Sequence, residues 1–209
     1  MKHEALFEGE DYLTICPSGD VDINVLAAAM HKSERWEEVV RGMTDLTVKY
    51  DPLKLSSAEA KAHFLSLLGS AESTEVDCGG PMTLAASFGA ECAPDADEIA
   101  LSLGISAKDW PQWLCSRTYR VTMMGFQPGF AYLEDIEADA LPSLPRLNTP
   151  RQKVAAGSIG FLGKRACLYA WDGPGGWPIG GRIAESLFRG DQEQPFLLRP
   201  GQLIRLAAS

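Results

Sequence analysis

Short apolar runs and helically spaced apolar residues alternate along the first third of the chain. Residues 12–16 form a short apolar run that is typical of a buried strand. Asp20 or Asp22 can then cap a helix over 23–30, because Ile, Leu, Ala and Met recur there at helical spacing. β-branched and aromatic residues predict a strand pair joined around Gly42, at 36–40 and 46–50. The chain is therefore predicted to begin strand, helix, strand, strand.

A second helix follows this strand pair. Ser56 and Glu59 have the spacing of a capping box, and the apolar stripe after them stops at Gly69. A last short strand at 74–78 would complete the order βαββαβ. That order matches a ferredoxin-like α/β sandwich, which we assign to residues 1–79.

The pattern changes after Gly79-Gly80-Pro81, where two flexible residues and a proline precede a new apolar strand at 82–88. Acidic caps predict two short helices, over 95–103 and 106–117. Period-two alternation then predicts strands separated by Gly/Pro loops, at 118–124, 154–162, 166–171 and 203–206. Residues 80–209 are therefore expected to form a small β-barrel or sandwich, which makes this an α+β protein of two domains.

Composition and charge exclude several classes of protein. With 209 residues and 45% hydrophobic content, the chain can build one large core or two small ones. The net charge of -9 argues against nucleic-acid binding, because neutralising phosphates needs a broad basic face. No apolar stretch reaches the length of a signal peptide or a membrane span. We expect a cytoplasmic protein that binds a small molecule and neither nucleic acid nor membrane.

The cysteines and histidines limit the chemistry. Five cysteines are odd in number, widely spaced and never in a Cys-x-x-Cys motif, so the sequence indicates no disulfide framework and no metal site. All three histidines precede residue 64, about sixty residues before the distinctive loops. Chemistry in those loops would proceed without a histidine from this chain, unless the two domains fold together.

Glycine is concentrated between Thr122 and Arg182, which hold half of the 20 glycines. Here the segment 125–132 follows a predicted strand directly, so its aromatic side chains emerge from a constrained turn. They can line a pocket or form a buried lid on the barrel, and the pattern alone favours neither. The candidate substrate-binding residues of this turn are Phe126, Pro128, Gly129, Phe130 and Tyr132.

Cations gather in the same part of the chain. Residues 140–182 carry six cationic side chains and one acidic side chain, Asp172, which indicates an anionic ligand on an otherwise acidic protein. Arg146 and Arg151 each follow a proline, which limits where the guanidinium can point, and the planar fork of arginine suits a carboxylate or phosphate. Two solvated surface cations would show the same pattern.

Two further glycine-containing segments complete the candidate site. Gly157 and Ser158 follow small residues, where backbone N–H groups and a hydroxyl can face an oxyanion, although a simple bulge explains them almost as well. Gly175, Gly176 and Trp177 form a rigid turn that ends in an aromatic residue. That turn lacks the Gly-Lys-Ser/Thr ending and the helix of a P-loop, so this chain carries no cofactor signature.

At these loops the sequence resembles a known family, the one that contains the B-type subunit of 5-oxoprolinase, allophanate hydrolase subunit 1 and a sporulation-kinase inhibitor. The motifs that carry the resemblance are Gly125-Phe126-x-Pro128-Gly129-Phe130-x-Tyr132-Leu133, Pro145-Arg146, Pro150-Arg151, Val154-x-Ala156-Gly157-Ser158-Ile159-Gly160 and Pro174-Gly175-Gly176-Trp177. The resemblance extends over nearly the whole chain. It implies a ferredoxin-like N-terminal domain followed by a cyclophilin-like, carboxyltransferase-type β-barrel.

The resemblance also implies one half of an active site. A second cyclophilin-like subunit, of the 5-oxoprolinase C type or the allophanate hydrolase subunit 2 type, would complete it, together with an A-type lactam-utilisation subunit. That complex couples hydrolysis of ATP, which normally arrives with magnesium, to opening of the 5-oxoproline lactam to glutamate. Phosphorylation of the carbonyl oxygen would activate the amide, and cations would stabilise the phosphoryl charge. We assign this role to Arg146 and Arg151, with Ser158 and Gly157 as orienting groups.

Two other functions fit the same resemblance. One is a subunit of a biotin-dependent urea carboxylase or allophanate hydrolase system, and the other is an inhibitor of a histidine kinase that acts without turnover. Supplying urea and carboxybiotin in place of 5-oxoproline would separate the two enzymes. An inhibitor would tolerate loss of Arg146 and Arg151 if both lie outside its interface.

Overall fold

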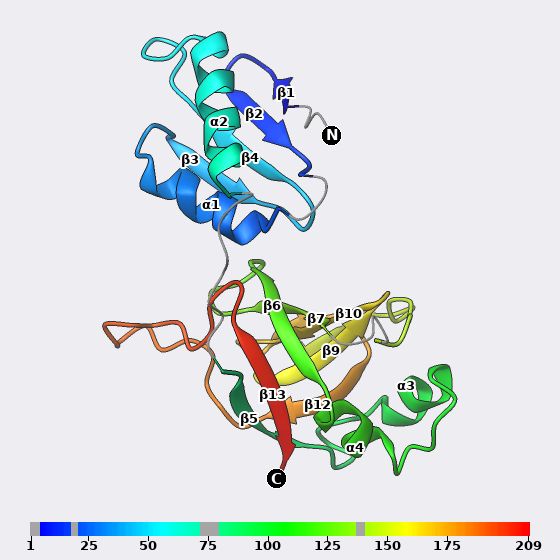
Figure 1. Ribbon diagram of the computed structural model, residues 1–209. Coiled ribbons are helices and arrows are strands. Elements are labelled where there is room, and N and C mark those ends of the chain that lie inside the picture. The colour runs from blue at the N-terminus through cyan, green and yellow to red at the C-terminus, as the bar shows by residue number, and fades with distance from the viewer. Residues whose placement is uncertain (1–4, 18–20, 72–79, 137–140) are drawn as a thin grey trace. The chain divides into compact units, whose positions relative to one another are not determined.

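The computed structural model describes residues 5–17, 21–71, 80–136 and 141–209. The chain divides into two compact units, Met1–Asp77 and Cys78–Ser209 (Figure 1). This division lies beside the joint predicted at 79–81, where residue 79 is outside the described residues. Each unit has a hydrophobic core of its own.

The first unit is a four-stranded antiparallel sheet in the order β1-β2-β4-β3. Its elements are β1 (Ala5–Glu8), β2 (Tyr12–Ile15), α1 (Ile23–Lys32), β3 (Glu38–Arg41), β4 (Leu46–Lys49) and α2 (Ser57–Ala71). Both helices pack on the same face of the sheet (Figure 1). The predicted helices and the β3–β4 strand pair are confirmed.

Side-chain caps set the starts of both helices. Of the two candidates for α1, Asp22 is the cap, since its Oδ1 accepts a hydrogen bond from the N–H of Asn24 at 2.8 Å. At α2 the N–H of Ser56 donates to Glu59 Oε2 at 3.0 Å, and the N–H of Glu59 donates to Ser56 Oγ at 3.4 Å. These bonds satisfy donors that have no partner within the helix, as the predicted capping box requires.

β1 forms one edge of the sheet, beside β2, and the sequence did not predict this strand. β1 pairs antiparallel with β2, with Ala5 opposite Ile15. Only Ala5 among its four residues is buried, so the segment lacks the alternation that marks a half-buried strand. The strand predicted at 74–78 lies outside the described residues, so the ferredoxin-like assignment of residues 1–79 stays a prediction.

The second unit is a closed β-barrel of seven described strands, in the order β10-β7-β6-β13-β5-β12-β9. Neighbouring strands are antiparallel, except that β13 runs parallel to β5. The strands are β5 (Met82–Ser87), β6 (Thr118–Met124), β7 (Ala131–Asp135), β9 (Ser158–Leu162), β10 (Arg165–Leu168), β12 (Ile179–Ile183) and β13 (Leu203–Ala208). The chain is thus an α+β protein with a β-barrel, as the sequence predicts.

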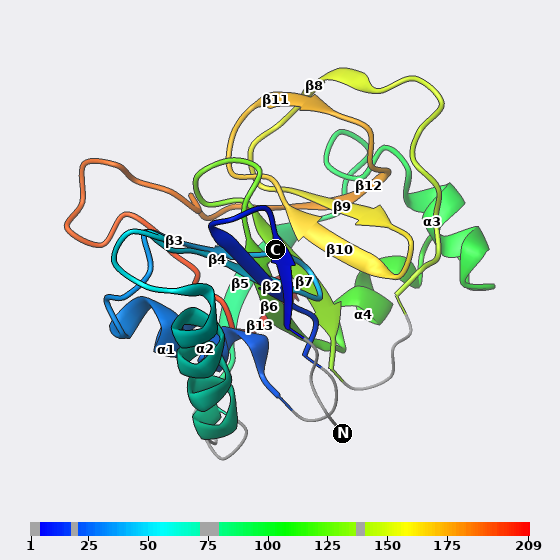
Figure 2. The ribbon, with the colours of Figure 1, turned by 90° about the horizontal axis from the view of Figure 1, so that it is seen from above.

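A separate two-stranded ribbon accompanies the barrel. It pairs β8 (Arg151–Val154) with β11 (Gly173–Gly175), and it lies beyond β9 and β12 in the view of Figure 2. The single strand predicted at 154–162 is therefore wrong. The chain turns between β8 and β9 because Gly157 has a φ of +80°, and a Cβ there would lie 2.4 Å from the carbonyl oxygen of Ile183. Only glycine fits this turn.

Two short helices belong to the same unit, α3 (Ala96–Ser102) and α4 (Trp110–Cys115). α4 begins four residues later than the predicted start at 106, after a turn in which the N–H of Asp109 donates to the carbonyl oxygen of Ser106 at 3.0 Å. The indole of Trp110 is buried in the barrel core, and its Nε1 donates to the carbonyl oxygen of Gly180 at 2.6 Å. This bond ties α4 to β12.

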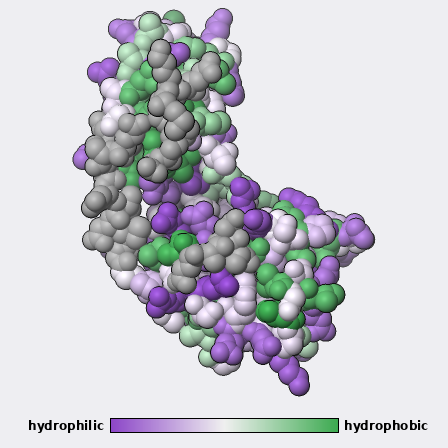
Figure 3. Space-filling model, turned by 45° about the vertical axis from the view of Figure 1, so that its right-hand side comes forward, coloured by the Kyte–Doolittle hydropathy of each residue, from purple (hydrophilic) through white to green (hydrophobic). Residues whose placement is uncertain are grey.

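One face of the molecule is shown in Figure 3. Hydrophilic and hydrophobic residues are interspersed over the face in Figure 3. Among the described helices, none combines the length and the apolar character that crossing a membrane requires. Cys16, Cys92, Cys115 and Cys167 carry free thiols.

Candidate functional site

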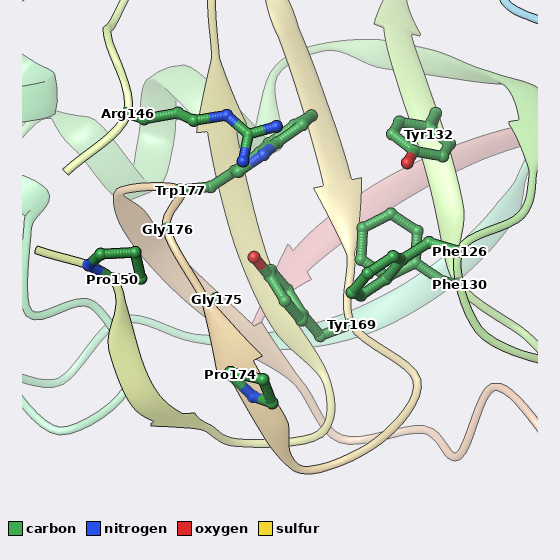
Figure 4. A pocket seen from close by; sticks show the side chains of 10 residues that line it. All are labelled: Phe126, Phe130, Tyr132, Arg146, Pro150, Tyr169, Pro174, Gly175, Gly176 and Trp177. Atoms are coloured by element: carbon green, nitrogen blue, oxygen red, sulfur yellow. The ribbon is translucent and has the colours of Figure 1, made fainter.

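A cavity of about 260 Å³ opens in the second unit, and we call it the aromatic cavity (Figure 4). It collects segments that are far apart in sequence: the turn between β6 and β7, the loop before β8, and the turn between β11 and β12. The residues that line it are Phe126, Phe130, Tyr132, Arg146, Pro150, Tyr169, Pro174, Gly175, Gly176 and Trp177. Most of the predicted substrate-binding residues are therefore brought together.

The mouth of the cavity is formed by a strained turn. The N–H of Gln127 donates to the carbonyl oxygen of Gly125 at 2.8 Å, and Phe126 between them has a φ of +68°. This is a γ-turn of the rare form, which costs a non-glycine residue about 1–3 kcal/mol. The turn projects Phe126 outward with 67% of its surface exposed, whereas Phe130 is buried. The centroids of the two rings are 5.2 Å apart. The strain thus places an aromatic ring at the entrance.

Pro128 and Gly129 shape this turn without lining the cavity. The carbonyl oxygen of Pro128 accepts a hydrogen bond from Trp171 Nε1 at 3.0 Å. Gly129 has a φ of +83°, and a Cβ there would lie 2.8 Å from the Cβ of Phe188. Both residues support the turn, and their role as direct substrate contacts stays a prediction.

The walls of the cavity are aromatic rings packed edge to face. Phe130 contacts Tyr132 at 5.0 Å and Tyr169 at 5.1 Å between centroids, and these rings share a buried cluster with Cys167. Gly175 lets the backbone approach the cavity closely, since a Cβ there would lie 2.6 Å from the hydroxyl oxygen of Tyr169. Figure 4 shows the hydroxyls of Tyr132 and Tyr169 directed into the space between the walls.

Burial shifts the pKa values of three polar groups in and behind these walls upward. It raises the pKa of Tyr132, and it raises the pKa of Tyr169 more strongly. A hydrogen bond with the backbone of Trp177 and the charge of Arg146 lower the pKa of Tyr169 by less. Burial also raises the pKa of the Cys167 thiol. At neutral pH both phenols are therefore protonated and can donate hydrogen bonds.

Arg146 is the single charged residue among those that line the aromatic cavity, within the described part of the chain. No carboxylate from the described residues lines the cavity to neutralise it. Arg146 is itself exposed, so its guanidinium can attract an anion at the rim of the cavity through its charge and its paired donors. The arrangement can therefore hold a small organic acid by its carboxylate, with two hydroxyls left to bind a carbonyl oxygen.

The other predicted arginine, Arg151, lines a different cavity of about 270 Å³, together with Ser158. Arg151 Nη2 donates to Asp95 Oδ1 at 2.7 Å, and Asp95 Oδ2 accepts from the N–H of Ile179 at 2.6 Å. The side chain of Asp95 thus joins β8 to β12 and does not cap α3, the role that its position predicts. The structure does not bring the two arginines together.

Gly157 lines neither cavity. It is buried in the barrel, where its N–H donates to the carbonyl oxygen of Tyr169 at 2.7 Å and its own carbonyl oxygen accepts from Ile183 at 2.9 Å. Tyr169 is the main site residue that the sequence analysis missed. It lies within the strand predicted at 166–171 and gives the same signal as a core residue, whereas the observed β10 ends just before it, at Leu168, and Tyr169 lines the cavity.

The described residues contain no group of three or more His, Cys, Asp or Glu side chains arranged to hold a metal ion. The groups available in the aromatic cavity are one guanidinium, two neutral phenols and aromatic faces. They suit binding and orienting a substrate. Proton transfer near neutral pH would need a group with a lower pKa than these phenols.

Comparison with known proteins places the chain in a family. Residues 14–198 match the family model "Carboxyltransferase domain, subdomain C and D". A protein of Escherichia coli O157:H7 named as the B subunit of 5-oxoprolinase is 37% identical over 118 residues, which are 56% of this chain and 53% of that protein. The chain thus spans about half the length of the curated relatives it matches.

Two solved structures have a similar fold. A conserved uncharacterized protein from Pyrococcus horikoshii has 30% identity and a TM-score of 0.58, with 99% of this chain and 97% of that chain covered. The urea amidolyase of K. lactis has 17% identity and a TM-score of 0.74, with 99% of this chain and 15% of that chain covered, a similarity of fold alone. On the family match, which covers most of its length, this chain belongs to the carboxyltransferase domain family, subdomains C and D.

Proposed function

We propose that the chain is a subunit of an enzyme complex that opens the lactam of 5-oxoproline in an ATP-dependent reaction, and that the aromatic cavity binds the substrate. Relatives named as the B subunit of 5-oxoprolinase support the reaction. The observation that carries the assignment of the site is Arg146, a cation without a neutralising carboxylate among the described lining residues, beside two neutral phenols.

The substrate has three parts that match this lining. Its carboxylate suits Arg146, because a guanidinium binds a carboxylate through two parallel hydrogen bonds. Its lactam carbonyl suits the hydroxyls of Tyr132 and Tyr169, which donate hydrogen bonds at neutral pH. Its small ring suits the aromatic faces of Phe130 and Trp177, within a cavity of about 260 Å³. One small molecule therefore occupies all three types of contact.

These residues bind and polarise the substrate. Hydrogen bonds from two phenols to the carbonyl oxygen draw electron density from the amide carbon and stabilise negative charge that develops on that oxygen. Phe126 stands at the entrance, where it offers an aromatic face to the substrate. Arg146 fixes the orientation of the ring through its carboxylate.

The aromatic cavity does not fit a magnesium-bound nucleotide. It offers one guanidinium for three phosphates, and none of its described lining residues is a carboxylate that could hold the metal. We therefore assign ATP to a different polypeptide of the complex. The proposed partners are the second cyclophilin-like subunit and the lactam-utilisation subunit, which would supply the groups that transfer protons. The finer fold assignments, ferredoxin-like and cyclophilin-like, belong to the same proposal.

This assignment changes the roles of three candidate residues. Arg151 is held by Asp95 outside the aromatic cavity, Ser158 lies beside Arg151, and Gly157 is part of the barrel. We propose Arg146 as the cation that contacts the substrate, and we place Arg151, Ser158 and Gly157 outside the reaction.

The test is reconstitution with the partner subunits. The purified complex, supplied with 5-oxoproline and ATP, should produce glutamate, and urea with carboxybiotin should not replace 5-oxoproline. A complete and folded complex that forms no glutamate would refute the proposed reaction.

A further inference from the structure

The second cavity is lined by groups that the proposed reaction does not use. It has a volume of about 270 Å³, and its lining residues are Glu91, Pro94, Arg151, Lys153, Val154, Ala155, Ser158 and Ile179. Hydrogen-bond donors, one carboxylate and apolar side chains all contribute to this lining. Its size suits a small ligand.

Arg151 lines this cavity and has one unused donor. Its Nη2 is fixed by Asp95 at 2.7 Å, and Asp95 is itself oriented by the N–H of Ile179. Its Nη1 is buried and has no hydrogen-bond partner in the described part of the chain. Buried donors in folded proteins are nearly always paired, so an unpaired one needs an explanation. A ligand that brings an acceptor oxygen would provide the missing partner once the guanidinium turns toward the cavity.

Ser158 is a further polar residue of the same lining. The residue is 4% exposed, and its backbone is used by the barrel, since its carbonyl oxygen accepts from the N–H of Tyr169 at 2.9 Å. Pro94, Val154 and Ile179 provide apolar contacts. Glu91 is exposed and supplies a carboxylate.

Charge decides between the possible ligands. Two cations, Arg151 and Lys153, line the cavity, but Asp95 pairs with Arg151 and Asp172 pairs with Lys153 at 2.9 Å. Glu91 adds a further negative charge and the nearby Arg182 a positive one, so the local balance is about neutral and disfavours a polyanion such as a nucleotide phosphate. A zwitterion meets both signs at once, because its carboxylate suits the donors and its ammonium suits Glu91.

We propose that this second cavity is a binding site for a small zwitterionic amino acid. The carboxylate is held by Arg151 and Ser158, the ammonium group by Glu91, and the apolar part of the ligand by Pro94, Val154 and Ile179. The site is separate from the aromatic cavity and does not depend on the proposed function.

The experiment is calorimetric titration of the full chain with L-proline, L-glutamine and L-glutamate, and with propionate as a carboxylate that lacks the ammonium group. Wild-type protein should bind at least one of the amino acids with a dissociation constant near or below about 1 mM, and more tightly than propionate. Glu91→Gln should weaken amino-acid binding about tenfold and leave propionate unchanged. Ser158→Ala should weaken both types of ligand severalfold.

The control is Arg146→Gln, which alters the aromatic cavity alone. It should leave amino-acid binding at the second cavity unchanged while it weakens binding of 5-oxoproline, so failure of this inference and failure of the proposed function can be told apart. Absence of heat with every amino acid at about 10 mM would overturn the inference. The inference would also be overturned if Arg146→Gln abolished amino-acid binding while Glu91→Gln and Ser158→Ala both left it unchanged.

Discussion

Arg146 and Arg151 look alike in sequence and differ in the structure. Each directly follows a proline, and they are five positions apart in one cationic stretch. Arg146 lines the aromatic cavity, where none of the described lining residues is a carboxylate. Arg151 is bound to Asp95 at 2.7 Å and helps to join β8 to β12. The partner that tertiary folding supplies, and not the local motif, decides whether an arginine is free to bind a ligand.

The largest expected effect on stability comes from removing the carboxylate of Asp95, which pairs with Arg151. Asp95→Ala leaves the guanidinium of Arg151 and the N–H of Ile179 without their acceptor, and we expect a loss of about 3 kcal/mol in the free energy of unfolding. Urea unfolding measures it. Asp97→Ala, an exposed acidic residue in the first turn of α3, is the matched control and should cost less than about 1 kcal/mol.

The next variant tests Arg151 itself. Arg151→Gln breaks the same ion pair but leaves Asp95 bonded to Ile179, and the arginine side chain is 31% exposed, so we expect a smaller loss of about 1–2 kcal/mol. Arg146→Gln should change stability by less than about 0.5 kcal/mol. Equal stabilities of the two variants would contradict the contrast between these arginines.

The aromatic cavity can be tested through a single hydroxyl. Tyr169→Phe removes one donor that the proposal places on the lactam carbonyl, and KM for 5-oxoproline should rise up to about tenfold. Tyr119→Phe is the control, because its hydroxyl donates to the carbonyl oxygen of Leu114 at 2.7 Å inside the barrel core. That variant should lower stability and leave KM as in the wild type.

The smallest expected effect is a dependence of the free energy of unfolding on pH. Burial raises the pKa of Tyr169 above its ordinary value of 10.0, so the unfolded chain loses the proton at lower pH than the folded chain. The contribution of Tyr169 to the free energy of unfolding should therefore be constant below about pH 10 and should decrease as pH rises from there toward the folded pKa. Thermal unfolding at increasing pH measures this, and Tyr169→Phe should make the decrease shallower.

The first unit was largely predictable because its signals are local. The capping box of Ser56 and Glu59 and the cap at Asp22 rest on residues that are two or three positions apart, and both form as expected. β1 was missed because a single buried residue in four gives no alternation. Local chemistry fixes where these helices start, whereas strand pairing depends on what the rest of the sheet provides.

The candidate site was predictable in its residues and less so in its grouping. The aromatic turn, Arg146 and the turn at 174–177 meet in one cavity, as their shared rigidity and charge indicated. Arg151 was expected in the same place and lies elsewhere, because Asp95, which the local pattern marks as a helix cap, captures it from 56 positions away. A long-range ion pair of this kind leaves no periodic signal in the sequence.

The most direct test of the account is KM for 5-oxoproline, measured on the reconstituted complex with wild-type chain, Arg146→Gln and Arg151→Gln. The account predicts that Arg146→Gln raises KM by about 10- to 100-fold, the value of a hydrogen bond to a charged group, and that Arg151→Gln leaves KM within about twofold of wild type. An unchanged KM with Arg146→Gln, or a large increase confined to Arg151→Gln, would contradict it.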